Sequence, residues 1–146
     1  MTVHSVRNHS LYAAPLRIAL GLVWAFAARF AGASSPAVWL AFATATFALV
    51  FLRFNDPRSR FLKRGAPEPL PDGATVATPV RQALQALLPS TAGVSVLAAI
   101  ALAFQPVLSA FLGGVAAGLG VSGAVMAYFT DPALFFDPRR GTVYRR

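Results

Sequence analysis

The chain has 146 residues, of which 56% are hydrophobic and only 12% are charged, and its formal net charge is +8. Soluble domains usually carry about 25% charged residues, so this composition argues against an ordinary soluble domain and favours a membrane protein. The absence of cysteine excludes disulfides, thiolate metal sites and cysteine nucleophiles.

Residues 1–10 are expected to form a cytoplasmic N-terminal tail. Two histidines, His4 and His9, lie in this segment without a nearby acidic residue or cysteine. Two such ligands make a poor metal site. We therefore expect both histidines to be solvated, and we expect neither a metal nor a cofactor.

Two apolar stretches follow, from about Leu11 to Ala33 and from about Pro36 to Phe54. Each is close to the roughly 20 residues that a helix needs to cross the hydrocarbon layer. The sequence Gly-Ala-Ser-Ser-Pro at 32–36 is typical of a chain reversal between two helices. Residues 31–33 also resemble a signal-peptide cleavage site, but the chain keeps the segment from Met1 onward, so we expect a retained membrane helix.

A dense group of basic residues comes directly after the second stretch. Such clusters attract anionic lipid head groups, at about 1 kcal/mol per basic residue, and the interleaved apolar residues would rest the segment on the membrane interface. Nucleic acid is a poor alternative, because no aromatic-rich polar platform accompanies the charge. Residues 11–65 are thus predicted to form a first transmembrane hairpin followed by a basic interfacial segment, whose lipid-binding residues are Arg53, Arg58, Arg60, Lys63 and Arg64.

The second half repeats this plan. Residues 66–80 read as a proline-rich cytoplasmic linker, and residues 81–90 have a helical pattern that would lie along the membrane. No charged residue occurs from Gln82 to Thr130, which suits two spans with a short turn. Pro106 is the favoured turn because proline disrupts a helix interior, and Gly113-Gly114 is the alternative. We expect a second transmembrane hairpin over 81–136 and a basic cytoplasmic tail over 137–146.

The basic residues also predict an orientation. Of the 13 Lys and Arg residues, all except Arg29 lie on the side of the spans that holds both termini and the central segment. The positive-inside tendency places that side in the cytoplasm. The predicted fold is therefore an all-α, multi-pass protein of the cell (inner) membrane, with four transmembrane helices in two hairpins, short interfacial helices and cytoplasmic termini.

An Asp-Pro pair ends each predicted hairpin, at residues 56–57 and 131–132, and a third follows at 137–138. The spacing suggests an internal repeat of the hairpin. Aspartate favours the N-cap of a helix and proline its first position, so we interpret Asp56, Asp131 and Asp137 as helix-capping residues that redirect the chain. The alternative is that Asp56 and Asp131 form an acidic pair that binds a cation or proton.

Small residues recur at intervals of four along two of the spans. Helices in lipid associate through close packing, which small side chains permit. We expect these stripes to pack within the chain, with dimerisation or docking on a partner as the alternative. The stripes are Ala37, Ala41 and Ala45 in the second span and Ala110, Gly114, Gly118 and Ser122 in the fourth.

The spans carry little sign of chemistry. Residues 120–123, Gly-Val-Ser-Gly, resemble the GxSG pattern of rhomboid-type intramembrane proteases, but a serine nucleophile needs a base, and the only histidines precede the first span. No acidic residue lies mid-span, and Arg17 and Arg29 are close enough to the span ends to extend to the head groups. We do not expect an enzyme.

Two functions remain. The first is a non-catalytic accessory subunit that packs against a larger membrane protein complex and serves assembly, stabilisation or lipid contact. The alternative is a small channel or transporter formed by homo-oligomerisation. The partners would be membrane lipids with other membrane subunits or further copies of the chain, and not nucleic acid. If the chain forms a channel, the hydroxyl residues of the spans should line one continuous path. These residues are Thr44, Thr46, Ser95, Ser109 and Ser122.

Overall fold

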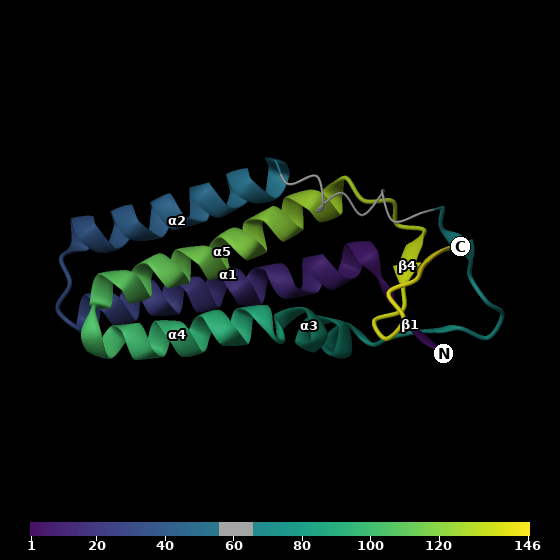
Figure 1. Cartoon of the computed structure of the whole chain (residues 1–146), viewed down its shortest axis with the longest axis horizontal. Helices are drawn as coiled ribbons and strands as arrows, with labels where there is room; N and C mark the ends of the chain where they lie inside the picture. Colours follow the sequence, from purple (N-terminus) through teal and green to yellow (C-terminus); the bar gives the residue numbers. More distant parts are fainter. Residues whose placement is uncertain (56–65) are drawn as a thin grey trace.

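Figure 1 shows the computed structural model, an elongated helical bundle with a small sheet at one end. The structure describes residues 1–55 and 66–146. Helices make up 68% of the described residues. They are α1 (Val6–Phe30), α2 (Ser35–Asn55), α3 (Pro79–Leu87), α4 (Ser90–Phe104) and α5 (Pro106–Tyr128).

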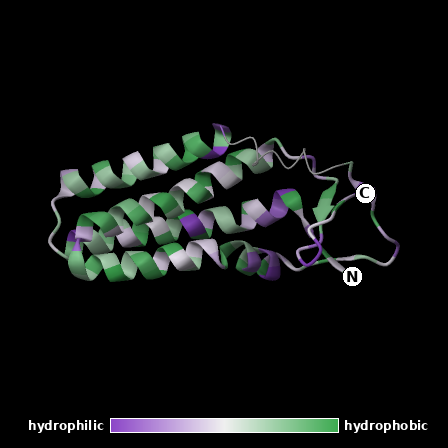
Figure 2. Cartoon of the chain, viewed as in Figure 1, coloured by the Kyte–Doolittle hydropathy of each residue, from purple (hydrophilic) through white to green (hydrophobic). Residues whose placement is uncertain are grey.

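Within the described residues, α1, α2 and α5 are each long and apolar enough to cross a membrane. Helices α3 and α4 meet at a bend of 50° and make a fourth candidate only if the bent pair counts as one span. Helix α4 alone has 15 residues, which at about 1.5 Å per residue is shorter than a bilayer's hydrocarbon core of about 30 Å. Apolar residues cover the bundle, and hydrophilic residues gather at the end with the sheet (Figure 2).

Helix α1 begins earlier than the sequence predicts. Its N-cap is Ser5, whose hydroxyl accepts a hydrogen bond from the Asn8 backbone N–H at 3.2 Å. The C-cap of α1 is Ala31, and the next residue, Gly32, has a φ of 100°. Glycine adopts this conformation without steric cost. The loop to α2 is therefore short, as the sequence predicts.

The turn between α4 and α5 confirms the choice of Pro106 over Gly113-Gly114. Gln105 is extended, with a φ of −146°, and Pro106 is the first residue of α5. Proline fits there because the first helical N–H has no partner within the helix. Gly113 and Gly114 lie inside α5 and serve packing instead.

Helix α5 is the axis of the bundle and contacts α1, α2 and α4 (Figure 1). By contrast, α1 and α2 have few contacts with each other, although they are consecutive. The first predicted hairpin is therefore not a closely packed pair, whereas α4 and α5 do pack together. The internal repeat stays a prediction.

One end of the bundle carries a five-stranded sheet that the sequence did not predict. Its order is β2-β5-β4-β1-β3, built from β1 (Thr2–Ser5), β2 (Glu68–Pro69), β3 (Thr75–Val76), β4 (Leu134–Phe136) and β5 (Val143–Arg145). β1 pairs antiparallel with β4 and parallel with β3, and β5 pairs antiparallel with β4 and parallel with β2. Val3, Phe135 and Tyr144 form its buried core. The expected tails at 1–10 and 137–146 and the expected linker at 66–80 are therefore folded together in part, contrary to the prediction.

Candidate functional site

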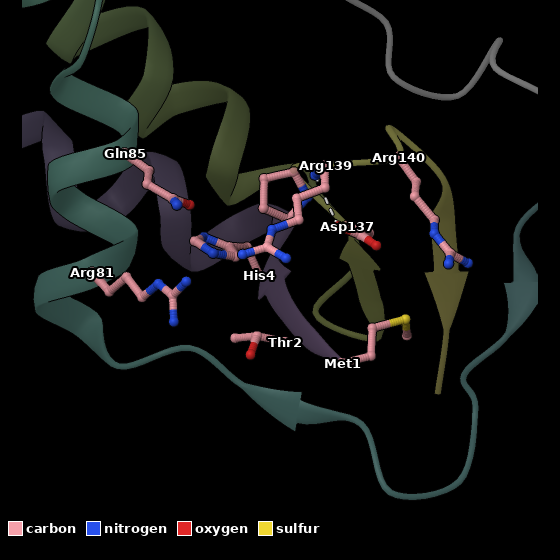
Figure 3. A pocket seen from close by; sticks show the side chains of 9 residues that line it. Met1, Thr2, His4, Arg81, Gln85, Asp137, Arg139 and Arg140 are labelled. Atoms are coloured by element: carbon pink, nitrogen blue, oxygen red, sulfur yellow. Dashed lines mark hydrogen bonds between the residues drawn. The ribbon is translucent and has the colours of Figure 1, made fainter.

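A cavity lies between the sheet and α3 (Figure 3), at the end of the molecule that holds both termini (Figure 1). We call it the basic cavity. Its volume is about 580 Å³, within the range of about 300–1,000 Å³ common for small-molecule sites. It is lined by Met1, Thr2, His4, Arg81, Gln85, Asp137, Pro138, Arg139 and Arg140.

Two separate parts of the chain contribute the arginines that line the cavity. Arg81 comes from α3, and Arg139 and Arg140 come from the turn between β4 and β5. In Figure 3 the guanidinium groups of Arg81 and Arg139 point toward the middle of the cavity, while Arg140 points toward its far edge. Because guanidinium groups stay charged in proteins, the cavity is strongly positive.

His4 forms the floor contributed by β1. Its side chain is 1% exposed, and neither ring nitrogen has a hydrogen-bond partner among the described residues. Burial lowers the pKa of His4 below 6.5, the nearby Arg81 charge lowers it further, and Asp137 opposes the shift. The imidazole is therefore neutral at pH 7, and the expectation of a solvated histidine is wrong.

A second cavity, of about 440 Å³, adjoins the first through Gln85, Asp137 and Pro138. His9 lines this one, and its ring lies 5.9 Å from the ring of His4 and 5.2 Å from that of Phe136. Across the described residues, no three His, Asp or Glu side chains come together as metal ligands.

The two described Asp-Pro pairs shape turns rather than helices. Asp131 Oδ1 accepts from the Ala133 N–H at 2.9 Å, and Asp137 Oδ1 accepts from the Arg139 N–H at 2.8 Å. Both carboxylates cap backbone donors as expected, but β4 and a turn follow in place of the expected short helices. Asp131 also forms an exposed ion pair with Arg145 at 3.2 Å. Asp56 lies outside the described residues.

Arg17 does not extend to the head groups, contrary to the prediction. It is 9% exposed and lies inside the bundle. Its Nε donates to Thr91 Oγ1 at 3.0 Å, and its Nη2 donates to the Ala86 carbonyl. These acceptors flank the bend between α3 and α4, so Arg17 fastens α1 to that bend.

The predicted stripe in α5 does pack within the chain. Ala110, Gly114, Gly118 and Ser122 are all buried. A Cβ at Gly114 would lie 2.3 Å from the Phe42 carbonyl oxygen, and a Cβ at Gly118 would lie 3.0 Å from Leu49 Cβ. Of the α2 stripe, Ala45 is buried, and Ala37 and Ala41 are half-buried. Two further glycines, which the spacing of four missed, contact α1: a Cβ at Gly113 or Gly120 would lie 2.5 Å or 2.7 Å from a backbone oxygen there.

The hydroxyl residues lie in separate contacts. Thr46 donates to the Phe42 and Gly114 carbonyls at 2.8 and 3.0 Å, and Ser95 accepts from Trp24 Nε1 at 3.4 Å. Ser122 donates to the Leu119 carbonyl at 3.3 Å. Ser109 is fully buried, and Thr44 is exposed.

Of the predicted lipid-binding residues, only Arg53 is described. It lies in the last turn of α2 and is half-buried. Arg58, Arg60, Lys63 and Arg64 lie outside the described residues.

The outer face of α2 is an exposed apolar surface of the bundle. We define it by Leu40, Phe47 and Phe51, which are 59–75% exposed. Over its most apolar stretch, 11% of α2 is buried, against 56% of α5. Helix α2 is thus attached to the bundle along one narrow face.

The basic cavity itself could not be read from the sequence. Arg81 and His4 are far apart along the chain, and the strand pairing that joins them involves very short segments. The sequence Thr78-Pro79 was one available signal, because it is typical of the start of a helix. The Thr78 hydroxyl indeed caps α3 and accepts a hydrogen bond from the Arg81 N–H at 3.4 Å. Comparison with protein-family models, curated proteins and solved structures gives no match.

Proposed function

We propose that the chain is a non-catalytic integral-membrane subunit that packs, through the outer face of α2, against a larger membrane protein. One observation carries this proposal. The small residues of α5 are buried against α1 and α2, whereas large apolar side chains of α2 are exposed on the surface of the bundle. The compartment assignment, with the sheet end in the cytoplasm of a cell that has an inner membrane, rests on the distribution of basic residues.

The closed interior supports a structural role. Three of the five hydroxyl groups that could line a channel, those of Thr46, Ser95 and Ser122, are bonded to separate backbone and side-chain partners. The glycines of α5 let its backbone approach α1 and α2 closely, which leaves little space between the helices. These features favour assembly or stabilisation over transport.

The aromatic character of α2 supports docking. Phe47 and Phe51 are 75% and 59% exposed, and aromatic residues are enriched where protein interfaces concentrate their binding energy. Helix α2 could exchange lipid contacts for a partner without disturbing the contacts of α5 with α1. The alternative is a homo-oligomeric channel, which needs a polar stripe on an outer face. Away from the helix ends, the exposed faces of α2 and α4 carry one hydroxyl residue, Thr44.

Native mass spectrometry of the chain, extracted gently from the membrane in which it is naturally made, tests the proposal. The wild-type chain should co-purify with a larger, different subunit in fixed stoichiometry. The double variant Phe47→Ala/Phe51→Ala should lose that subunit. A control variant on the outer face of α4, Leu97→Ala/Ile100→Ala, should keep that subunit, because it removes exposed apolar side chains from a different helix.

A homogeneous homo-oligomer without any other subunit would contradict the proposal and favour the channel. Flux measurements in liposomes would then be the next experiment. Equal loss of the partner in both double variants would show that α2 is not the docking face.

A further inference from the structure

The arginines of the basic cavity lack carboxylate partners. Within the described part of the chain, the one ion pair joins Arg145 to Asp131, and neither residue lines the cavity. The carboxylate that does line it, Asp137, is 5% exposed, and its Oδ1 is bonded to the Arg139 backbone N–H. The cavity is therefore lined by three arginines and one largely buried carboxylate.

The floor of the cavity has an unsatisfied polar group. Both ring nitrogens of His4 are buried without a partner among the described residues. Leaving such a group unpaired is unfavourable, and native structures pair most buried polar atoms. A ligand oxygen would satisfy one nitrogen after a small shift of the exposed side chains around the ring.

We propose that the basic cavity is a binding site for a phosphoryl group. Guanidinium groups bind phosphate oxygens through two parallel hydrogen bonds and remain charged throughout. Arg81 and Arg139 provide such groups from two directions, and His4 provides a third polar contact (Figure 3). The volume of about 580 Å³ accommodates a group larger than a phosphate ion.

The phosphoryl group has two possible sources. The cavity lies at the end of the bundle, beside the starts of α1 and α3, where the head groups of a surrounding bilayer and the aqueous phase are both within reach. The ligand is thus an anionic lipid head group or a soluble phosphate compound. The proposed site does not depend on the proposed subunit role.

The test uses the purified full chain in a neutral detergent. Native mass spectrometry measures the binding of short-chain phosphatidylglycerol, short-chain phosphatidylcholine and inorganic pyrophosphate. The wild-type chain should bind one phosphatidylglycerol in preference to phosphatidylcholine. The variant Arg81→Gln/Arg139→Gln should weaken this binding by about tenfold or more, because it removes two charge-assisted contacts. Both arginines are exposed, so circular dichroism should show an unchanged fold.

The control is Arg145→Gln/Arg146→Gln, which removes the same charge from the same end of the molecule but outside the cavity. Its affinity should stay within about twofold of wild type, because exposed charges are screened by salt. Displacement of phosphatidylglycerol by pyrophosphate would identify a soluble phosphate compound as a ligand of the same site, and failure to displace it would identify the lipid. Equal weakening in both variants, or no binding of any probe to the wild type, would overturn the proposal.

Discussion

Helices α2 and α5 are similarly apolar and have 21 and 23 residues, yet one is peripheral and the other central. The difference lies in side-chain size. Helix α5 contains five glycines, and α2 contains none. Without a hydrophobic driving force between helices in lipid, close backbone approach decides which helix is buried. Hydropathy therefore makes both helices candidate membrane spans, and glycine placement determines their order in the bundle.

The largest expected loss of stability comes from a variant that disrupts the contact between α2 and α5. In Gly114→Ala the new Cβ would lie 2.3 Å from the Phe42 carbonyl oxygen and 2.9 Å from Ala45 Cβ, so the backbones must separate. Overpacking of this kind costs about 1–3 kcal/mol, and we expect the upper end. Reversible unfolding in mixed micelles measures the change in free energy of unfolding.

Gly93→Ala is the matched control, because a Cβ at Gly93 meets nothing within 4 Å. This variant should be neutral or stabilised by about 0.5–1 kcal/mol, as expected for alanine replacing glycine in a helix. Equal destabilisation by the two variants would contradict the packing account.

The next prediction compares the hydrogen bond that attaches α4 to α1 with the hydrogen bond that attaches α2 to α5. Thr91→Val removes the acceptor of the Arg17 Nε and should cost about 1.5–3 kcal/mol, because a charged donor is left without its partner. Thr46→Val removes the hydroxyl that joins α2 to α5 and should cost about 0.6 kcal/mol. Thr44→Val, at an exposed position, is the control and should have no measurable effect. The reverse order for Thr91 and Thr46 would show that Arg17 does not fasten the bend.

The pH dependence of stability tests the burial of His4 in the sheet. Burial and Arg81 lower the pKa of His4 below 6.5, so below that pH the unfolded chain binds a proton more readily than the folded one. Stability should therefore fall as the pH drops from about 6.5 toward the folded-state pKa, by about 1.4 kcal/mol per unit of difference between the two pKa values. Denaturant titrations from pH 7.5 downward should show a flatter profile for His4→Gln than for wild type. Parallel profiles would remove His4 as the source.

The sequence revealed what depends on local pattern. The apolar lengths of α1, α2 and α5, the turn at Pro106 and the stripe along α5 all follow from residue type and spacing. The sheet did not follow, because its strands have two to four residues and pair segments from both ends of the chain. The burial of Arg17 was missed for a related reason. Its acceptors, Ala86 and Thr91, come together only at the bend between α3 and α4.

Photolabelling from lipid tests the contrast between the exposed helix α2 and the buried helix α5 most directly, because it uses the wild-type chain. A phospholipid with a diazirine in its acyl chain is activated in liposomes and in the native membrane, and mass spectrometry locates the labelled peptides. We expect heavy labelling of α2 and little labelling of α5 in liposomes, and protection of α2 in the native membrane, where the partner covers it. Labelling of α5 as heavy as that of α2 in liposomes would contradict the packing order. Equal labelling of α2 in both membranes would contradict the subunit proposal.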